Sequence, residues 1–392
     1  MLETILNTAA HGLLNANGWE ILAYAALTTH LTIVSVTIFL HRAQAHRALE
    51  LHPAVAHVFR FWLWLSTGMV TREWVAIHRK HHARCETDED PHSPVSRGLR
   101  TVLLRGSELY RAEARNAQTL AQFGQGTPDD WIERRVYSRY IWQGVGTLLV
   151  ADVLMFGALG ATVWAVQMLW IPIWAAGVVN GLGHFFGYRN YASRDRSHNL
   201  LPWGLLIGGE ELHNNHHTYP TSAKLSLKWW EFDIGWMYIS VLRALRLARP
   251  RKLPPKARIG ALRGQVDVAL LHTVIANRYD LMARYARALR GALRHELRAG
   301  GSRTLLRAAR RVIGRDRDML DANATALLDE VARRHPLLGQ LLRMREELKT
   351  VWEHSSASAE QLRAQLQDWC QRAEHSGIGA LRELSLSLRS YA

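Results

Sequence analysis

The chain has 392 residues, of which 48% are hydrophobic, and its 49 Lys and Arg against 34 Asp and Glu give a net charge of +15. That length accommodates a membrane core together with a separate domain. The composition excludes a disordered chain, a collagen and a small secreted scaffold. Its two cysteines, Cys85 and Cys370, exclude a disulfide framework and a cysteine-based zinc site. Histidine is the unusual residue, because many of the 20 are clustered.

Three apolar stretches are candidates to cross a membrane, at about residues 19–40, 141–160 and 163–184. The first is a run of 22 residues with ionisable groups only at Glu20 and His30. The second and third form a helical hairpin in which Asp152 is the only acidic residue. Residues 1–18 then form an N-terminal periplasmic or interfacial segment.

The placement of Lys and Arg indicates the orientation. None occurs before Arg42 or between Arg139 and Arg189, whereas the rest of the chain is dense in them. Because these residues are retained on the cytoplasmic side of short loops, we expect a multi-pass protein of the bacterial inner membrane, with its N-terminus and hairpin tip outside. The stretch from Ala54 to Val70 then cannot cross, and should be buried against the cytoplasmic domain or lie in the interface.

Residues 249–392 differ in composition from the rest of the chain. They hold about 27 Lys and Arg against about 15 acidic residues, and Arg, Ala and Leu recur in them at helical spacing. We therefore predict a membrane domain over 19–248 and a basic helical cytoplasmic extension over 249–392. The basic charge suits docking of an acidic protein, contact with anionic lipid, or solvation alone. With no recognised nucleic-acid-binding fold and no interleaved aromatic residues, we expect no nucleic-acid partner.

Three histidine clusters follow the apolar segments: HRAQAH at 41–46, HRKHH at 78–82 and HNNHH at 213–217. On a helix, positions i, i+3 and i+4 share one face, so each HxxHH cluster forms a ligand face. His41 and His46 are five residues apart, about 140° around an ideal α-helix. They cannot share one metal unless the helix loosens there, and could instead reach two different ions.

Imidazole ligands suit Fe, Zn, Cu or Ni, so ligand type alone leaves the metal open. Eight clustered histidines exceed the four ligands of a single zinc site, which favours a dinuclear centre. The alternative to a metal centre is that these histidines are solvated polar residues among Arg and Lys. The fold class we predict is an all-α integral membrane protein with few transmembrane helices, a cytoplasmic helical di-metal domain and a helical C-terminal extension.

These clusters and their spacing resemble the three histidine boxes of the membrane-bound fatty acid desaturases, closest to the stearoyl-CoA (Δ9) desaturase-like bacterial branch. Matching features are TDEDPH at 87–92, NGLGH at 180–184 and GEELHNNHHTYP at 209–220. The resemblance covers roughly residues 29–245. It implies O2-dependent desaturation of saturated fatty acyl chains at a di-iron centre, with Asn180 reaching one iron through a water. The histidine ligands that it implies are His41, His46, His78, His81, His82, His184, His213, His216 and His217.

The remaining features concern the substrate and the electron source. Trp62 and Trp74 are candidates to line an acyl tunnel. The acyl-CoA members of the family have a polar Arg-Asp pair before the second box, whereas this chain has Val-Ala-Ile at 75–77, so the acyl chain is carried by membrane phospholipid or by CoA. His335-Pro336 lacks the two glycines of a fused cytochrome b5 motif. We therefore expect a separate ferredoxin, rubredoxin or cytochrome b5-type donor with its reductase.

Two other functions compete with desaturation. A di-iron membrane hydroxylase or ketolase shares the boxes and inserts oxygen into a lipid or alkyl substrate. A membrane metal carrier also uses histidine, but should place its ligands within the spans rather than at their cytoplasmic ends. His11, His30, His57, His92 and His198 have no partner at ligand spacing and are expected to be structural or surface residues.

Overall fold

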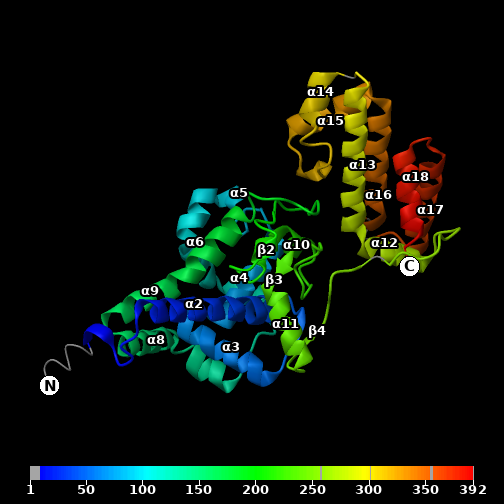
Figure 1. Ribbon diagram of the computed structural model, residues 1–392. Helices are drawn as coiled ribbons and strands as arrows, with labels where there is room; N and C mark the ends of the chain where they lie inside the picture. The colour runs from blue at the N-terminus through cyan, green and yellow to red at the C-terminus, as the bar shows by residue number, and fades with distance from the viewer. Residues whose placement is uncertain (1–8, 257, 301, 354–355, 392) are drawn as a thin grey trace. The chain divides into compact units, whose positions relative to one another are not determined.

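The computed structural model describes residues 9–256, 258–300, 302–353 and 356–391. It divides into two compact units, one comprising Met1–Arg189 with Asp195–Pro254 and the other Asn190–Arg194 with Pro255–Ala392 (Figure 1). The second unit begins within a proline pair, six residues beyond the boundary expected at 248. Part of the expected N-terminal segment 1–18 lies outside the described residues.

The first unit is built on two long apolar helical stretches. Helix α2 (Gly18–Ser35) begins at Asn17, whose side chain accepts from the N–H of Glu20 while the Glu20 side chain accepts from the N–H of Asn17, a reciprocal cap. It continues into the π-helix η1 (Val36–Ala45), and the pair is long and apolar enough to cross a membrane. Helix α9 (Ala158–Ile171) and the π-helix η3 (Pro172–Leu182) together meet the same test.

The hairpin partner of α9 is the shorter helix α8 (Ile141–Phe156), whose 16 residues fall below the roughly 20 that a straight helix needs to span hydrocarbon. The chain reverses at Gly157, with φ of 62°, rather than between residues 160 and 163 as the hydropathy suggested. A side chain at Gly160 would collide with the backbone carbonyl of Asp152. The missing side chain therefore allows α8 and α9 to pack closely.

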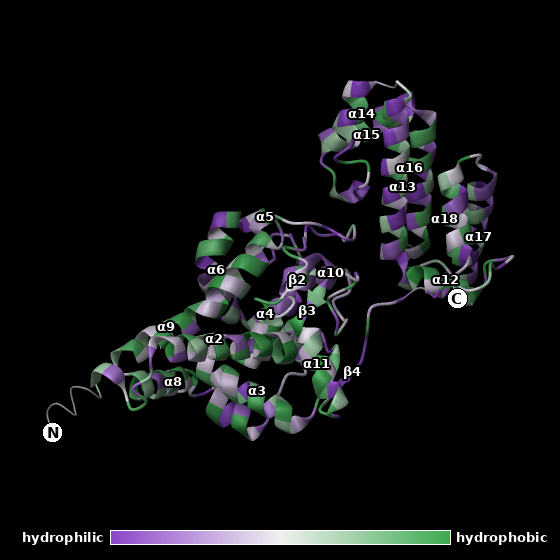
Figure 2. Ribbon diagram, viewed as in Figure 1, coloured by the Kyte–Doolittle hydropathy of each residue, from purple (hydrophilic) through white to green (hydrophobic). Residues whose placement is uncertain are grey.

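Helix α3 (Pro53–Ser66) packs mainly against α2 and α8, and Val58 and Phe61 on it are exposed. Of the two expectations for this stretch, its exposed apolar side chains suit a position in the interface better than burial against the histidine-bearing domain. The apolar colouring in Figure 2 extends over α2, α3, α8 and α9. An exposed apolar face on a helix packed against these neighbours suits contact with lipid.

The remaining helices of the first unit carry and surround the histidine clusters. They are α4 (Thr71–Arg84), α5 (Pro94–Arg97), α6 (Leu99–Ala114), α7 (Ala117–Phe123), η2 (Glu133–Tyr137), η4 (Glu210–Leu212), α10 (His213–Thr218) and α11 (Ile234–Ala244). The unit is mostly helical, as predicted, but two short strand pairs were missed: β1 (Leu49–Leu51) is antiparallel to β4 (Ala248–Pro250), and β2 (Trp203–Gly204) is parallel to β3 (Phe232–Asp233). Strands of two or three residues are too short to show an alternating pattern.

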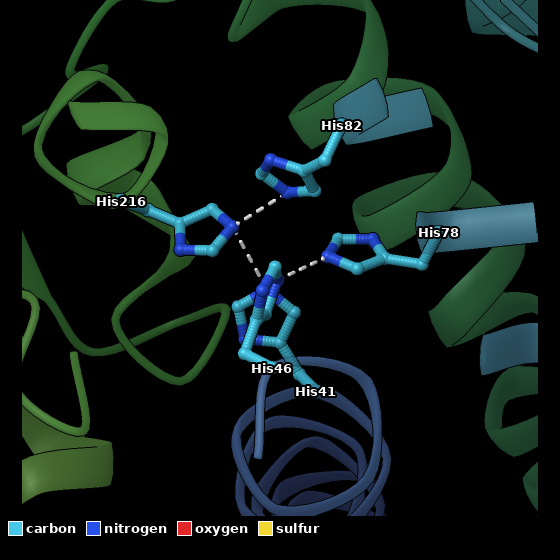
Figure 3. Close-up of side chains that lie close together, drawn as sticks. All are labelled: His41, His46, His78, His82 and His216. Carbon is cyan, nitrogen blue, oxygen red and sulfur yellow. Dashed lines mark hydrogen bonds between the residues drawn. The ribbon is translucent and has the colours of Figure 1, made fainter. Parts of the chain in front are cut away.

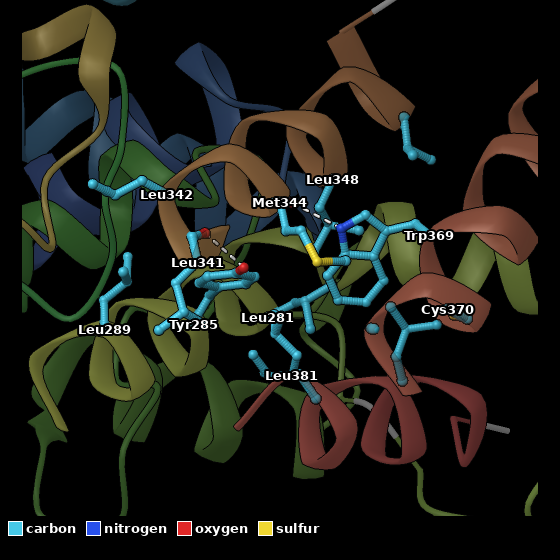
Figure 4. Close-up of a cluster of buried hydrophobic side chains, with 14 of the residues drawn as sticks. Leu281, Tyr285, Leu289, Leu341, Leu342, Met344, Leu348, Trp369, Cys370 and Leu381 are labelled. Atoms are coloured by element: carbon cyan, nitrogen blue, oxygen red, sulfur yellow. Dashed lines mark hydrogen bonds between the residues drawn. The ribbon is translucent and has the colours of Figure 1, made fainter. Parts of the chain in front are cut away.

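The second unit has a hydrophobic core of its own. Its helices are α12 (Val268–Ala276), α13 (Arg278–Arg298), α14 (Arg303–Ala309), η5 (Arg317–Met319), α15 (Ala322–Arg334), α16 (Pro336–Glu353), α17 (Ala359–His375) and α18 (Gly379–Arg389). Figure 4 shows Leu281, Tyr285 and Leu348 packed around Trp369, whose indole N–H donates to the Met344 carbonyl at 2.7 Å. The basic extension is thus a packed helical unit whose arginines lie mostly outside this core.

One buried hydrogen bond in this core gives a stability prediction. The Tyr285 hydroxyl donates to the Leu341 carbonyl at 2.8 Å, and Tyr285 is fully buried. Tyr285→Phe should lower the free energy of unfolding of this unit by about 0.5–1.5 kcal/mol, because it removes one hydrogen bond and leaves the ring in place. Chemical denaturation followed by circular dichroism would measure it, and an unchanged unfolding midpoint would contradict it.

Candidate metal centre

Five of the predicted histidines converge on one point. His41 and His46 project from η1, His78 and His82 from α4, and His216 from α10, with their rings directed toward one another (Figure 3). One nitrogen from each of the five lies within 4.8 Å of one nitrogen from every other. We call these five residues group 1.

The π-helix explains how His41 and His46 join the same group. In η1 the backbone N–H of His46 donates to the His41 carbonyl at 3.0 Å, a bond between residues i and i+5. This wider turn brings positions five apart onto one face, and the two ring centroids are 4.7 Å apart. His41 and His46 are therefore close enough to share one site, the alternative that required the helix to loosen. The helix loosens where it must for them to share a site.

A second group lies beside the first. His184, just beyond η3, places its Nε2 atom 3.0 Å from Nε2 of His213 on α10. The ring of His217 is centred 4.7 Å from that of His184 and 5.2 Å from that of His81 on α4. We call His81, His184, His213 and His217 group 2. Because α4 and α10 each supply histidines to both groups, the two groups are neighbours.

Cys85 also lies near group 2, but on its outer side. Its Sγ atom is 4.0 Å from Nδ1 of His184, whereas the opposite nitrogen of that ring faces His213. Burial raises the pKa of the Cys85 thiol, which keeps it protonated. The Cys85 Sγ atom nevertheless lies within 4.8 Å of a ring nitrogen of each of His81, His184 and His217, so these four side chains could hold a metal ion by distance, while His213 joins group 2 through its 3.0 Å approach to His184.

Buried polar contacts hold the short helix α10 and the end of η1 in place. The Asn215 amide donates to the Leu225 carbonyl at 3.0 Å and to Glu231 at 2.7 Å. The Arg79 guanidinium donates to the carbonyls of Gln44 and Ala45, which links α4 to the end of η1. These contacts account for the polar residues interspersed within the second and third clusters.

Carboxylates contact the outer nitrogens of several of these histidines. His81 Nδ1 is 3.0 Å from Asp90, His217 Nδ1 is 2.9 Å from Asp195, and His41 Nδ1 is 2.9 Å from Glu210. A carboxylate at Nδ1 favours a proton there and leaves the Nε2 lone pair directed inward. The sequence singled out Asp90 and Glu210 only as parts of motifs, without a contact to His81 or His41, and gave no signal for Asp195, because no spacing connects Asp195 to a histidine.

The burial of the site favours neutral imidazole. Burial lowers the pKa of His46, His78, His82, His213 and His216 well below the usual value, and neighbouring imidazoles lower it further. His81 is the exception: burial alone would lower its pKa, but the Asp90 carboxylate outweighs burial and raises it. Neutral imidazole is the form that binds a metal ion.

The nitrogen geometry fits metal ions. Within group 1, Nε2 of His216 is 3.1 Å from Nε2 of His41 and 2.9 Å from Nε2 of His82. Two nitrogens that each lie about 2.1 Å from one ion, at right angles, are about 3.0 Å apart. In group 2, Nε2 of His81 and of His217 is buried without a hydrogen-bond partner among the described residues. An ion in each group would satisfy these inward-facing lone pairs.

Comparison with known proteins identifies the family. A family model described as fatty acid desaturase matches residues 17–271, well over half of the chain. The chain belongs to the fatty acid desaturase family. It is therefore a fatty acyl desaturase, an oxidoreductase, as the histidine boxes predicted.

Similar proteins include enzymes named for acyl lipids. The chain is 31% identical over 227 residues to an sn-1 stearoyl-lipid 9-desaturase of Anabaena variabilis, covering 57% of this chain and 80% of that protein. It is 28% identical over 244 residues to Delta-9 acyl-lipid desaturase 1 of Arabidopsis thaliana, covering 61% and 77%. It is 26% identical over 251 residues to Delta-9 desaturase-like 4 protein of the same plant, covering 60% and 78%.

A second family model, described as transposase, matches residues 272–392, less than a third of the chain. This segment forms most of the second unit, whose described residues form helices joined by loops, with a single bridge between Ile259 and Tyr391. Among the described residues of that unit, no three His, Cys, Asp or Glu side chains meet at metal-binding distance.

A cavity of about 550 Å³ adjoins the histidines of the desaturase. His41 and His78 of group 1 and His213 of group 2 line it, together with Asn180. Trp74 also lines it and stacks on His78, with ring centroids 4.9 Å apart. The second tunnel candidate, Trp62, is not among the lining residues, and its indole N–H donates to Thr32 at 3.0 Å.

His92 has a closer relation to the site than its sequence position suggested. It is buried, it lines the cavity, and its ring stacks on His81 with centroids 4.4 Å apart. Its backbone N–H donates to Asp90 at 3.1 Å, so it helps hold the carboxylate that orients His81. His92 is therefore buried beside the site rather than at the surface, and it lies with His81 and Asp90 in a group whose ligand atoms are within 4.8 Å of one another.

The carboxylate contacts give a prediction for metal affinity. Asp195→Asn should weaken metal binding about 10- to 100-fold, because His217 loses the charged partner that orients its ring and fixes its proton. Competition with a chelator would measure the affinity. Asp88→Asn, at an exposed carboxylate close to the second cluster, is the matched control and should bind metal like the unmodified chain. Equal affinities for the two variants would contradict the role of Asp195.

Proposed function

We propose that the chain performs O2-dependent desaturation of saturated fatty acyl chains at the 9-position, on membrane glycerolipid, at a di-iron centre held by nine histidines. The observation that carries this proposal is the pair of adjacent histidine groups, of which His41, His78 and His213 line one cavity of about 550 Å³. A cavity of that size suits a ligand as large as an acyl chain. The names of the cyanobacterial and plant relatives favour stearoyl lipid and position 9.

The proposed ligands follow the two groups. His41, His46, His78, His82 and His216 would hold one iron, and His81, His184, His213 and His217 the other, with Asn180 reaching the second through a water. When bound, the iron pair supplies the oxidising power toward O2 and an unactivated methylene that no side chain possesses. Imidazole also binds other metals, so the assignment to iron rests on the family.

The residues of the chain position the substrate. Ile33, Val36 and Ile171 give the cavity an apolar wall, on which a saturated chain exchanges lipid contacts for protein contacts without entering water. Trp74, fixed by stacking on His78, limits the paths an acyl chain can take past the histidines. Holding one methylene beside the metal ligands selects the carbon atoms that react.

The head group and the surroundings are part of the same proposal. We propose a lipid-linked substrate, because apolar Val-Ala-Ile precedes His78 where acyl-CoA enzymes have a polar pair and because the relatives are named for acyl lipids. We further propose a multi-pass inner-membrane location with the histidines on the cytoplasmic side. In this arrangement residues 19–248 form the membrane domain and residues 249–392 a basic extension. We also propose that a separate ferredoxin, rubredoxin or cytochrome b5-type protein, with its reductase, donates the electrons. The density of Lys and Arg beside the histidine segments supports that orientation.

Product analysis tests the proposed reaction. A host with mainly saturated lipids, supplied with an electron donor, would express the chain or its His81→Ala variant. We expect C16 or C18 monoenes with the double bond at carbon 9, absent from the variant, in gas chromatography and mass spectrometry after derivatisation of the double bond. Hydroxylated acyl products would instead indicate a membrane hydroxylase. No new product with a working donor would contradict lipid oxidation.

A further inference from the structure

One stretch of the cavity wall carries polar side chains without partners. On α6, Ser107, Tyr110 and Arg111 all line the cavity, at the i, i+3 and i+4 positions of one helical face, and Arg115 follows at its end. Glu73 on α4 lines it as well. Helices α4 and α6 pack against each other, so these side chains share one region of the wall.

Several hydroxyl and indole groups on the wall have hydrogen-bond partners within the protein. The hydroxyls of Thr37, Ser66 and Thr67 donate to the carbonyls of Gly208, Trp62 and Leu63. The indole N–H of Trp164 donates to the Val145 carbonyl. A buried hydroxyl without a partner differs from these groups, whereas buried ring nitrogens of the lining residues His41, His92 and His213 also lack a hydrogen-bond partner among the described residues.

Tyr110 carries such a buried hydroxyl. Its hydroxyl is buried and has no hydrogen-bond partner among the described residues. Burial raises the pKa of Tyr110, and the charge of the Glu73 carboxylate, which lines the same cavity, raises it further. A buried hydroxyl without a partner is costly, and a ligand atom that accepts its hydrogen bond removes that cost.

Arg111 and Arg115 extend this region with positive charge. Neither takes part in any ion pair among the described residues, whereas Arg105 on the same helix pairs with Glu108. Arginine is suited to phosphate because its planar guanidinium donates two parallel hydrogen bonds. The cavity wall thus carries the buried hydroxyl of Tyr110, the carboxyl of Glu73 and the guanidinium groups of Arg111 and Arg115, which form no ion pair among the described residues.

We propose that Tyr110 and Glu73 bind the carbonyl of the ester that joins the acyl chain to its head group, while Arg111 and Arg115 bind a phosphate of that head group. The proposal rests on the proposed function and names the group that its site recognises. Tyr110 donates to the carbonyl oxygen, and Glu73 donates a second hydrogen bond when protonated. Phosphate is common to a phospholipid and to CoA, so the experiment has an arm for each.

A fixed carbonyl has a consequence for the product. Glu73 and His78 are five residues apart on α4, which places them about 7.5 Å apart along the helix axis. A carbonyl held beside Glu73 therefore sets how many methylenes separate it from the histidines. The double bond should lie at the same carbon, counted from the carbonyl, in C16 and C18 chains.

The first test is the position of the double bond in the product, counted from the carbonyl, which we call the product register. The full chain, Tyr110→Phe and Glu73→Gln would be expressed in the saturated-lipid host and given C16 and C18 acids in turn. We expect a single position in both chain lengths for the unmodified protein. In Tyr110→Phe we expect about 3- to 10-fold less product, the effect of one neutral hydrogen bond, with additional positional isomers. Tyr279→Phe, in the other unit, is the control and should keep the unmodified register and yield.

Photo-crosslinking separates this inference from the reaction itself. Purified full-length protein would be irradiated with phosphatidylglycerol or acyl-CoA carrying a diazirine on the acyl chain, or with a diazirine fatty acid methyl ester. We expect peptides of α4 and α6 to be labelled by a phosphate-bearing ester, with labelling reduced in Tyr110→Phe and Arg111→Ala/Arg115→Ala. The methyl ester should respond to Tyr110→Phe alone. Whichever phosphate ester labels more strongly identifies the head group.

The outcomes are distinguishable. Unmodified register in both Tyr110→Phe and Glu73→Gln, together with unmodified labelling, would overturn the inference while leaving desaturation intact. Absence of any monoene from the unmodified protein would overturn the proposed function, and the labelling would still decide whether Tyr110 and Glu73 bind an ester. Thermal unfolding of Tyr110→Phe and Glu73→Gln shows whether either variant is misfolded. If one is, the product and labelling of the other variant test the inference.

Discussion

His216→Ala is expected to reduce monoene formation at least about 100-fold, a larger effect than loss of a carboxylate partner, because it removes a direct metal ligand. Its Nε2 atom lies within 3.1 Å of His41 Nε2 and of His82 Nε2, at the junction of ligands from η1 and α4. Iron per chain should fall from two toward one, since only group 1 loses a ligand. Elemental analysis of purified protein and gas chromatography of host lipids measure the two effects.

The control for this substitution is His272→Ala, at an exposed histidine of α12 in the other unit. It should retain the unmodified iron content and product yield. If His216→Ala kept both at the level of this control, His216 would not be a ligand and group 1 would lose its central member.

Arg42→Met is expected to destabilise the first unit by about 3–5 kcal/mol, the usual cost of leaving a buried charge without its partner. The Arg42 side chain is 1% exposed and contacts both carboxylate oxygens of Asp233, at 2.8 and 3.1 Å. It also donates to the carbonyls of Ala223 and Gly208, both at 2.9 Å. One guanidinium therefore joins η1, next to His41, to the segments that follow β2 and α10.

Unfolding in detergent, monitored by tryptophan fluorescence, would measure the change in stability. Arg251→Ala is the matched control, because Arg251 forms a half-exposed pair with Glu50 and its loss should cost less than about 1 kcal/mol. An effect of Arg42→Met no larger than that of Arg251→Ala would show that the buried pair does not hold the first unit together.

Much of the candidate site could be predicted from the sequence, because HxxHH spacing is a local property of a helix. His78, His81 and His82 lie on α4, and the HNNHH histidines on the short helix α10. The division between the two groups could not be predicted: His78 and His82 belong to group 1 and His81 to group 2, which depends on how α4 is rotated against its neighbours. The spacing of five residues between His41 and His46 indicated that the helix would have to loosen for them to share a site, whereas the contact from Asp195 to His217 is a tertiary feature without a sequence signal.

As with the candidate site, the local features of the fold could be predicted from the sequence. Apolar runs identified α2 with η1 and the α8–α9 hairpin, because the length and composition of a helix are visible in its own residues. The position of the hairpin turn was not, since several glycines occur there and only Gly157 has the positive φ that ends α8. The helical spacing in 249–392 indicated helices, but the burial of Trp369 among Leu281, Leu348 and Tyr285 follows from contacts between distant segments.

The most direct test of the central claim is anomalous X-ray scattering at the iron edge from crystals of the iron-loaded protein. We predict two peaks in each chain, one enclosed by His41, His46, His78, His82 and His216 and the other by His81, His184, His213 and His217. A single peak, or peaks away from both groups, would contradict a dinuclear histidine centre as the site of this chemistry.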